Sequence, residues 1–348
     1  MPPLRPRKGR GAATNPGSRF ESLDVEYDSP HKDLPVLTTE LFRDATKSVI
    51  SRNDSPDLNF NATFNPYRGC EHGCAYCYAR PTHEYLGLSA GLDFESKLFV
   101  KEDAPELLKK TFSASNWKPQ LVMMSGVTDC YQPIERHLRL TRESLKVFAD
   151  FLNPVDIVTK SELVTRDIDI LKTMSSPDVA SVTMSVTSLD PALANKLEPR
   201  ASSPKRRLKA IEELRKGGVR VGVILGPVIP GLNDHEIFDI LQATSDAGAI
   251  TATYTLLRLP HGVKLLFSEW LAAHYPNRKD RVLNQVKDTR EGVLYDPSYG
   301  TRMRGIGEFA DQIERMFHIA QKRFGLDRSL TPLRTNLFRI PRQQMSLF

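Results

Sequence analysis

The sequence has few cysteines and no long apolar run. Only 4 of its 348 residues are cysteine, which is too few for the disulfide framework of a small secreted protein. No stretch approaches the roughly 20 uninterrupted apolar residues that a membrane span needs. The N-terminus is basic but has no apolar run behind it, so we expect neither a membrane anchor nor a signal peptide. Free thiols suit a reducing compartment, and we therefore expect a cytoplasmic protein.

Acidic residues are missing from both ends of the chain. Residues 1–19 and 328–348 contain no Asp or Glu, whereas together they hold nine positive charges. Because the whole chain has a net charge of +6, the body between these two arms carries −3. The Pro-, Gly-, Arg- and Ser-rich composition predicts that residues 1–30 form a disordered basic arm. Such arms either bind phosphates or serve as solvated tails.

Three of the four cysteines, Cys70, Cys74 and Cys77, lie within eight residues. A loop this short can aim three thiolates at one face of a cluster, with Gly73 easing the turn. Three thiolates hold three irons of a [4Fe–4S] cube and leave the fourth iron open for a substrate. The alternatives are a zinc site with His72 as fourth ligand, or a disulfide. Structural zinc sites usually have two separated ligand pairs, and Cys130 is the single remaining cysteine, so we favour the cluster.

Apolar runs alternate with segments of helical spacing along most of the chain. An extended segment at 59–67 leads into the cysteine loop, and a helical stretch broken at Pro81 follows it. The later strand candidates are residues 98–100, 120–124, 155–159, 179–186, 219–225 and 250–255, and the helical segments are 104–114, 134–152, 162–174, 205–217 and 234–247. This alternation predicts βαβ units and a parallel sheet. We expect an α/β domain over residues 31–260 with the cysteine loop at 70–77, a helical extension at 261–340 and a tail at 341–348.

The cysteine loop and its surroundings resemble the radical SAM superfamily, and within it the spore photoproduct lyase-like branch, also called DNA repair photolyase-like. The resemblance covers about residues 55–260 and is carried by Asn65-Pro-Tyr-Arg-Gly-Cys70, by Cys77-Tyr-Ala-Arg-Pro and by Ser125-Gly-Val-Thr-Asp-Cys-Tyr-Gln-Pro-Ile-Glu135. It implies a partial, open (β/α)₆ barrel with chemistry at the carboxyl ends of its strands. It also implies a [4Fe–4S] cluster, an external electron donor, and S-adenosylmethionine (SAM) that is cleaved reductively to methionine and a 5′-deoxyadenosyl radical.

The resemblance also implies cofactor contacts after successive strands. The polar stretch after the second strand would bind the ammonium of SAM, or else it is an ordinary turn capped by Asp129. Lys160, after the third strand, would pair with the SAM carboxylate or stay solvated. Hydroxyls after the fourth strand would face the ribose, and the loop after the fifth would contact adenine or simply cap a helix. The predicted cofactor-binding residues are Tyr76, Ser125, Gly126, Thr128, Asp129, Lys160, Ser185, Ser188, Gly231 and Asp234.

Cys130 and Tyr131 are the predicted catalytic residues. Lesion-splitting enzymes of this branch use a cysteine near the second strand as a hydrogen donor. Cys130 follows the Ser/Thr-Asp pair, whereas the donor in the family precedes it, so Cys130 donates from a shifted position or is a small buried thiol. Tyr131 would be a radical relay or a packed core residue. Glu198 and Arg200, after the fourth strand, would face substrate or form an ion pair on the rim.

The last five residues resemble the peptide by which bacterial repair and replication proteins bind the sliding clamp. Gln344 would set the register, Met345 stands where leucine is usual, and Leu347 and Phe348 are apolar anchors. The alternative is a hydrophobic end that folds back on its own core. Three functions follow: a radical SAM enzyme acting on a nucleobase lesion in DNA; one acting on RNA, a peptide or a small metabolite; or a non-catalytic Fe–S scaffold recruited to the clamp.

Overall fold

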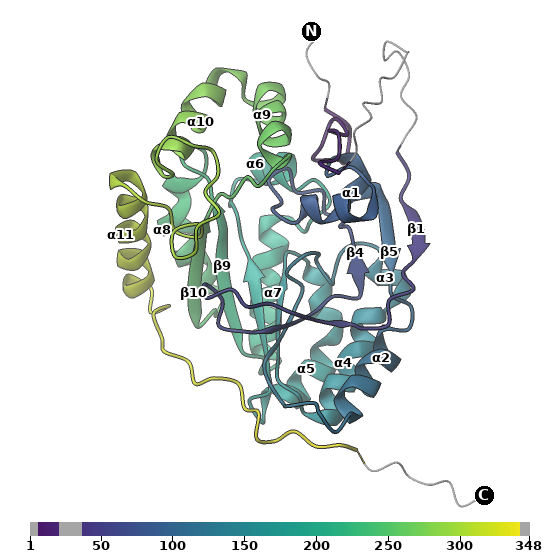
Figure 1. Cartoon of the computed structure of the whole chain (residues 1–348). Helices are drawn as coiled ribbons and strands as arrows, with labels where there is room; N and C mark the ends of the chain where they lie inside the picture. The colour runs from purple at the N-terminus through teal and green to yellow at the C-terminus, as the bar shows by residue number, and fades with distance from the viewer. Residues whose placement is uncertain (1–5, 21–36, 342–348) are drawn as a thin grey trace, which may run out of the picture.

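The computed structural model describes residues 6–20 and 37–341 (Figure 1). Its main layer is a seven-stranded sheet in the order β10-β9-β8-β7-β6-β3-β2. Six strands are parallel, and β2 (Ile50–Arg52) runs antiparallel to β3. The parallel strands are β3 (Ala62–Phe64), β6 (Val122–Met124), β7 (Val155–Thr159), β8 (Ala180–Ser185), β9 (Val221–Val228) and β10 (Thr251–Leu256). Because their order in space follows the chain, the sheet winds one way and ends at β10 and β2, which confirms the partial, open α/β barrel.

The outer face of the sheet is apolar and is covered by helices. Val155 and Ile157 of β7 pack in one core with Phe148 of α4 (Leu140–Phe151). Alternate residues of a strand point to opposite faces, so one face of each strand supplies this core. The other covering elements match the predicted helical segments: α2 (Ala104–Ser113), α3 (Glu135–Leu138), η2 (Glu162–Asp167), α5 (Ile168–Ser175), α7 (Pro204–Lys216), η3 (Asp234–Glu236) and α8 (Ile237–Asp246).

The inner face of the sheet is polar and partly exposed. Asp156 of β7 accepts hydrogen bonds from Ser181 (2.8 Å) and from Thr183 of β8. Thr183 pairs in register with Gly222 of β9, which pairs with Thr251 of β10. Closed barrels fill their interior with layers of branched apolar residues. Hydroxyl and carboxyl groups on the inside of this half-barrel leave room for a polar ligand.

The strand predicted at 98–100 forms, but in a second sheet. There β5 (Lys97–Val100) lies between β1 (Glu40–Arg43), to which it is parallel, and β4 (Tyr67–Arg68), to which it is antiparallel. A short apolar run does not reveal its partner strand. The break predicted at Pro81 is also wrong. Pro81 lies in the first turn of η1 (Arg80–Leu86), where its missing N–H costs nothing.

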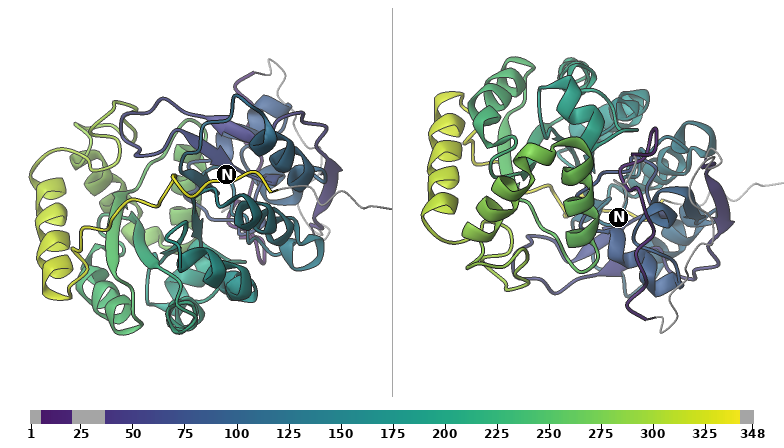
Figure 2. Two further views of the ribbon diagram at one scale, coloured as in Figure 1. Left: turned by 90° about the horizontal axis from the view of Figure 1, so that it is seen from below. Right: turned by 90° about the horizontal axis from the view of Figure 1, so that it is seen from above.

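The C-terminal extension begins with helices at the carboxyl end of the strands. Figures 1 and 2 show α9 (Val263–His274) and α10 (Lys279–Asp288) above this end, with η4 (Pro276–Arg278) between them, and α11 (Glu308–Arg323) beside α8. The helices of the extension predicted at 261–340 end with α11, and residues 327–341 run extended across the opposite end of the sheet (Figure 2). Within the described ranges, no helix has both the length and the apolar character to cross a bilayer.

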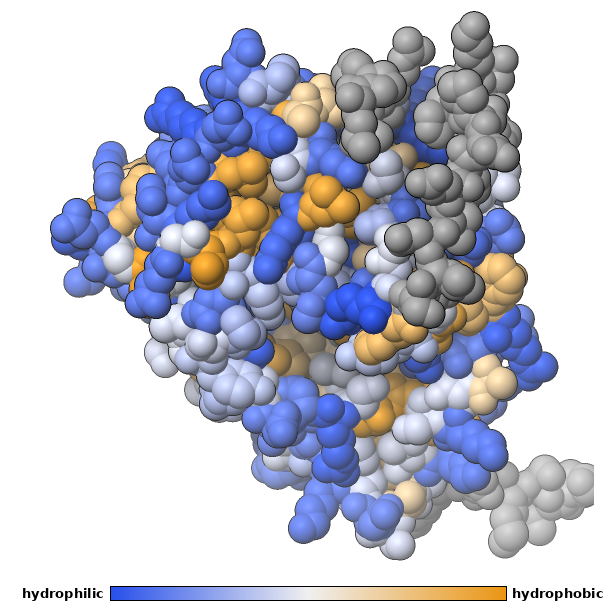
Figure 3. All heavy atoms as spheres, turned by 45° about the horizontal axis from the view of Figure 1, so that its top comes forward, coloured by the Kyte–Doolittle hydropathy of each residue, from blue (hydrophilic) through white to orange (hydrophobic). Residues whose placement is uncertain are grey.

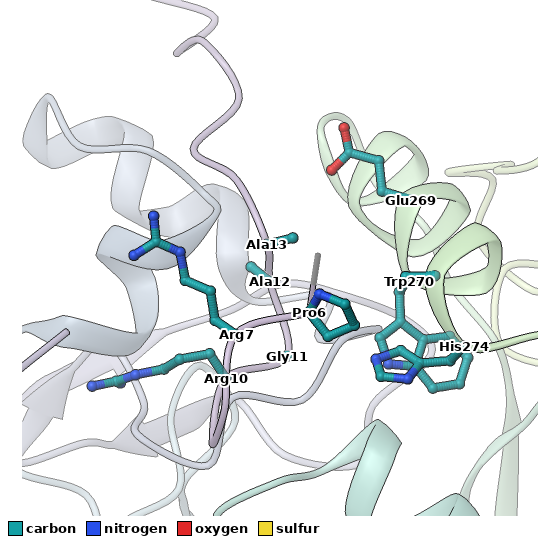
Figure 4. Close-up of a pocket in the computed structure, with 10 residues that line it drawn as sticks. Pro6, Arg7, Arg10, Gly11, Ala12, Ala13, Glu269, Trp270 and His274 are labelled. Atoms are coloured by element: carbon teal, nitrogen blue, oxygen red, sulfur yellow. The ribbon is translucent and has the colours of Figure 1, made fainter. Parts of the chain in front are cut away.

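The prediction of a disordered arm over residues 1–30 is wrong for residues 6–20, which pack on the body. Arg10 is 9% exposed and Ala12 is 3% exposed. Figure 4 shows this segment beside Trp270 and His274 of α9, and the side chains of both segments line one small cavity. The segment therefore closes over the same end of the sheet as α9. We call residues 6–20 the N-terminal strap.

Candidate functional site

The cysteine loop follows β4 at the carboxyl end of the half-barrel. Cys70 and Cys74 are buried, and Cys77 is partly exposed. The backbone is tied by Cys70 N–H to Phe94 O (2.9 Å), by Cys77 N–H to Cys74 O (3.2 Å) and by Ala75 N–H to Leu197 O (2.9 Å). Gly73 has φ +65°, and a Cβ there would lie 2.7 Å from a Glu95 carboxylate oxygen. The turn therefore needs glycine both for its conformation and for its space.

A buried ion pair between Arg80 and Glu95 holds this loop from behind. The Arg80 guanidinium donates to the Cys74 carbonyl from Nε (2.9 Å) and from Nη2 (2.8 Å), and it is paired with Glu95. Both side chains are completely buried. The other donors of Arg80 bind the carbonyls of Ala90 and Gly91. Breaking a buried pair of this kind leaves an uncompensated charge, so the loop position is strongly specified.

The N-terminal strap packs directly on the loop. Gly11 and Ala12 donate their backbone N–H groups to the two oxygens of Glu95 (3.1 and 2.8 Å). A Cβ on Gly11 would lie 1.7 Å from the carbonyl oxygen of Gly73. Arg10 donates to the backbone carbonyl of Glu95 (2.6 Å). Glu95 thus joins the strap, Arg80 and the cysteine loop into one unit, and no local signal in the sequence pointed to it.

The cysteine loop supplies three thiols, the number that a [4Fe–4S] cluster with one open iron takes from its protein. In the part of the chain that the structure describes, no group of three His, Cys, Asp or Glu side chains is arranged to hold one metal ion. A cube takes one thiolate on each of three irons, so its ligands need not converge on one point. Burial raises the pKa of Cys74 and of Cys77, and the charge of Cys70 adds to both shifts. Thiols in such a site become thiolates when metal charge compensates them.

His72, the fourth ligand in the zinc alternative, lies between the loop and the end of β6. Its Nδ1 is 3.3 Å from Asp129 Oδ2. Burial lowers the pKa of His72, but the neighbouring Asp129 and Cys70 outweigh it and raise that pKa to about 10. The Nδ1 atom of His72 is therefore engaged by Asp129.

Tyr76 meets a buried network centred on Glu198. The Tyr76 hydroxyl donates to Glu198 and is 3.2 Å from the hydroxyl of Thr187, which itself donates to Glu198 (2.6 Å). Arg207 forms an ion pair with Glu198, and the Lys160 ammonium lies 5.9 Å from the Tyr76 ring centroid. Burial raises the pKa of Glu198, but Arg207 and Lys160 outweigh it and lower that pKa to about 2.

Glu198 and Arg200 each form an ion pair, but not with each other. Glu198 is buried, away from the rim, and its ion-pair partner is Arg207. Arg200 pairs with Glu71 of the cysteine loop instead (2.9 Å). No sequence pattern links Glu198 to Arg207, because their contact depends on how α6 (Pro191–Leu197) and α7 meet. The result places Tyr76, Thr187 and Lys160 around one carboxylate next to Cys74.

The polar stretch after β6 is also brought to the cysteine loop. Thr128 donates to the carbonyl of Gly69 (2.6 Å). Asp129 accepts from the Thr159 hydroxyl and from Lys160 N–H (both 2.8 Å), and from Tyr131 N–H (2.9 Å). The Asp129 carboxylate thus connects the ends of β6 and β7 and caps a local turn. This is the role expected if the stretch is an ordinary capped turn. Ser125 accepts from Cys130 N–H (3.2 Å), and a Cβ on Gly126 would meet no atom within 4 Å. Open space at Gly126 suits the approach of a ligand.

The residues predicted after β8 and β9 are only partly gathered at this end. Ser185 lies 3.3 Å from the carbonyl of Gly226, and Ser188 donates to Glu236 (2.7 Å). Gly231 faces Gln285 of α10, and Asp234 begins η3. A residue that the sequence reading missed, Asn233, holds the loop by three hydrogen bonds to the backbone of Ile229, Thr187 and Pro227 (2.6, 2.6 and 3.0 Å).

Cys130 and Tyr131 are packed in the main apolar core, and both are fully buried. The carbonyl of Cys130 accepts from Thr141 of α4 (2.6 Å). The Tyr131 hydroxyl donates to Asp167 (3.0 Å), and Arg166 lies 5.9 Å from its ring centroid. Burial raises the pKa of both groups. These environments are those of core residues, and a radical role for either residue stays a prediction.

Known proteins resemble this chain over most of its length. The sequence pattern of the Radical SAM superfamily matches residues 64–244. An uncharacterized protein of Mycobacterium tuberculosis is 31% identical over 261 residues, which cover 74% of this chain and 76% of that protein. A radical SAM Nα-GlyT isomerase of Pseudomonas phage M6 is 27% identical over 187 residues, covering 52% of this chain and 37% of that protein.

Solved structures share the fold. Spore photoproduct lyase complexed with dinucleoside spore photoproduct superposes with a TM-score of 0.57 at 17% identity, over 82% of this chain and 79% of that one. A cysteine-to-serine mutant of the same lyase gives a TM-score of 0.58 with the same identity and coverage. The expected resemblance to the spore photoproduct lyase branch is therefore confirmed as a likeness of fold. With a superfamily match over more than half of its residues and a cysteine loop at the carboxyl end of an open parallel half-barrel, the chain belongs to the radical SAM superfamily of enzymes.

Proposed function

We propose that this enzyme carries one [4Fe–4S] cluster on Cys70, Cys74 and Cys77, cleaves SAM reductively, and acts on a nucleobase lesion in DNA. The observation that carries the cluster assignment is the anchored cysteine loop, whose three thiols sit beside the open polar interior of the half-barrel. When bound, the cluster supplies an electron to SAM, which yields methionine and a 5′-deoxyadenosyl radical.

The residues of this chain would bind and orient SAM in that interior. Lys160 would pair with the carboxylate, since its ammonium lies at a strand end and forms no ion pair among the described residues. The open space at Gly126 would admit the methionyl group. The Glu198 network would hold Tyr76 and Thr187 in place around the cofactor, because buried and fully satisfied polar networks are rigid. Ser185, Ser188, Gly231 and Asp234 would lie on the ribose and adenine side.

Two observations support a nucleobase lesion as substrate. The solved structure that shares this fold is named as a complex with a dinucleoside spore photoproduct. The mouth of the half-barrel also carries exposed aromatic side chains, among them Tyr78 beside Cys77. A damaged base must leave the stack to reach such a site, and aromatic rings can hold it there. RNA, a peptide or a small metabolite is the second candidate, which the phage relative named as an isomerase keeps open.

The proposed partners are an external electron donor and the sliding clamp. The clamp-binding peptide, Gln344, Met345, Leu347 and Phe348, lies outside the described residues. The chain enters it from the end of the sheet opposite the cysteine loop (Figures 1 and 2). A partner held there would leave the mouth of the half-barrel open. A reducing cytoplasm is the compartment that suits the cluster.

The test is anaerobic reconstitution followed by reduction with dithionite in the presence of SAM, with 5′-deoxyadenosine measured by chromatography. We expect product from the wild type and none from Cys74→Ala, whose iron content is measured in parallel. Lesion-containing DNA should accelerate the cleavage, whereas undamaged DNA and RNA of the same length should not. No product from protein with a full, reducible cluster would refute the proposed chemistry, and equal cleavage with every nucleic acid would refute the substrate.

A further inference from the structure

Exposed aromatic rings with cations against them line the mouth of the half-barrel. Phe20, Tyr78, Tyr85 and Tyr299 are between 48% and 72% exposed. Arg258 lies 5.3 Å from the Tyr78 centroid, Arg302 4.5 Å from Tyr299 and Arg19 5.1 Å from Phe20. Figure 3 looks obliquely onto this end and shows apolar side chains set among hydrophilic ones around a recess. Rings this exposed contribute little to the stability of the fold, and a group of them on one surface indicates a binding site.

Contacts between neighbouring side chains connect several of these pairs. Asp57 forms an ion pair with Arg302 and accepts from the backbone N–H of Gly300, next to Tyr299 (2.7 Å). This Gly300 bond lowers the pKa of Asp57, and the nearby charge of Arg258 lowers it further. On the other side, the ring centroids of Tyr295 and His261 are 6.5 Å apart. Burial lowers the pKa of His261, and the nearby charge of Arg19 lowers it further. The last pair is Phe20 and Tyr85, whose ring centroids are 5.2 Å apart. We call this set of side chains the rim strip. Its members are Tyr299, Arg302, Arg258, Tyr78, Tyr295, His261, Arg19, Phe20 and Tyr85, and Tyr78 is next to Cys77.

Arg258 of the rim strip and its buried neighbour Arg290 form no ion pair within the described ranges. Arg258 donates only to the weak acceptor Met303 Sδ (3.5 Å), and its buried Nε has no partner among the described residues. Arg290 is 1% exposed; its Nη2 donates to the carbonyls of Leu257 (2.7 Å) and Arg302 (3.2 Å), whereas Nε and Nη1 are buried without a partner in that part of the chain.

The two guanidinium groups also repel each other. Burial lowers the pKa of Arg290, and Arg258 lowers it further, against a smaller opposing effect of Asp296. Buried cations with free donors are costly unless an anion satisfies them. Arginine forks match phosphate oxygens in both geometry and charge. Arg258, which is partly exposed, therefore has the chemistry of a phosphate site next to rings on which bases can stack, whereas Arg290 is buried and adds its charge from inside the protein.

We propose that the rim strip binds single-stranded DNA, with a backbone phosphate at Arg258 and unpaired bases stacked on Tyr299 at one end and on Phe20 and Tyr85 at the other. This inference rests on the proposed function and names the form in which DNA reaches the site. Stacking on protein rings requires bases whose faces are free, which excludes an intact duplex. A strand laid along the strip passes Tyr78 and presents one nucleotide to the cysteine loop.

The test is fluorescence anisotropy with the cluster-loaded protein under anaerobic conditions and without SAM, so it does not depend on turnover. The probe is a labelled, undamaged single strand of about 12 nucleotides, within the range that such grooves cover. Arg258→Gln should weaken binding about tenfold and reduce the salt dependence by about one released ion. Tyr299→Ala should weaken binding about tenfold as well, and Tyr299→Phe should restore it, because stacking needs the ring and not the hydroxyl. Arg315→Gln, on the exposed side of α11, is the control for loss of a charge and should bind like the wild type.

Three results would overturn the proposal. Binding by Arg258→Gln and Tyr299→Ala at wild-type strength would show that the strand lies elsewhere. Tighter binding of RNA of the same sequence would change the substrate class. Weaker binding of SAM, but not of DNA, by Arg258→Gln would mean that Arg258 holds the cofactor carboxylate. These three binding results do not depend on 5′-deoxyadenosine formation. Failure of the rim strip proposal can therefore be distinguished from failure of the proposed SAM cleavage.

Discussion

The two basic arms are similar in composition and differ in structure. The N-terminal strap and the segment 327–341 are both rich in arginine and interrupted by proline. The strap is buried on the cysteine loop through Arg10 and Gly11, whereas most of 327–341 is exposed and crosses the far end of the sheet (Figure 2). That segment is held by a few contacts, such as Arg334 N–H to Asp178 O (2.8 Å). Composition alone therefore does not decide whether an arm is ordered; a complementary surface on the body does.

The largest effect is expected from removing the anchor of the strap. Glu95→Gln leaves the buried Arg80 guanidinium without its counter-charge, and we expect a loss of about 3–5 kcal/mol in the free energy of unfolding. Chemical denaturation of the metal-free protein measures it. Glu314→Gln, in the exposed pair with Arg304, is the matched control and should cost less than about 1 kcal/mol. Equal losses in the two variants would show that Glu95 anchors nothing.

A smaller effect is expected from crowding the strap itself. Gly11→Val places carbon where the Gly73 carbonyl stands, which should destabilise the protein by about 1–3 kcal/mol or detach the strap. A detached strap would uncover the cysteine loop, so the reconstituted variant should lose iron faster in air than the wild type. Ser329→Val, at an exposed position of the other arm, should change neither quantity. Unchanged iron retention in Gly11→Val would separate the strap from protection of the cluster.

The far arm should affect stability without affecting the cluster. Phe338 is partly buried, with its ring 6.2 Å from that of Phe112 and 6.0 Å from that of Phe151. Phe338→Ala should cost about 1–2 kcal/mol, since part of its apolar surface is already exposed. Thermal unfolding gives the loss, and iron content after reconstitution should match the wild type. A drop in iron content would mean that the two ends of the sheet are coupled.

The smallest effect on stability is expected from the terminal peptide. Deleting residues 344–348 should leave the unfolding temperature unchanged and abolish binding to a bacterial sliding clamp, because Leu347 and Phe348 are the proposed anchors. Titration calorimetry with the purified clamp measures the binding. Retained binding would show that the clamp does not depend on this peptide.

Local patterns predicted the main elements well. The apolar runs from residue 120 to residue 255 all form strands of one parallel sheet, because buried strands and amphipathic helices leave periodic signals. The pattern failed where a partner decides the outcome. The run at 98–100 is a strand, yet it pairs with β1 and β4. Pro81 starts a helix in place of ending one, since position within the turn decides its effect.

The sequence by itself determined the chemistry that this chain can host: three cysteines on one short loop, the alternation of strands and helices that gives a parallel sheet, and membership of the radical SAM superfamily. Residue spacing within a short loop and the period of apolar residues are local properties, so they can be recognised in the sequence without the fold. Only the tertiary structure decided that Glu95 joins the strap to Arg80, that Glu198 contacts Tyr76, and that Arg258 lies close to the buried Arg290. These contacts join residues between 15 and 122 positions apart. Long-range electrostatic and hydrogen-bond partners leave no periodic trace in the chain, because each depends on how whole elements pack.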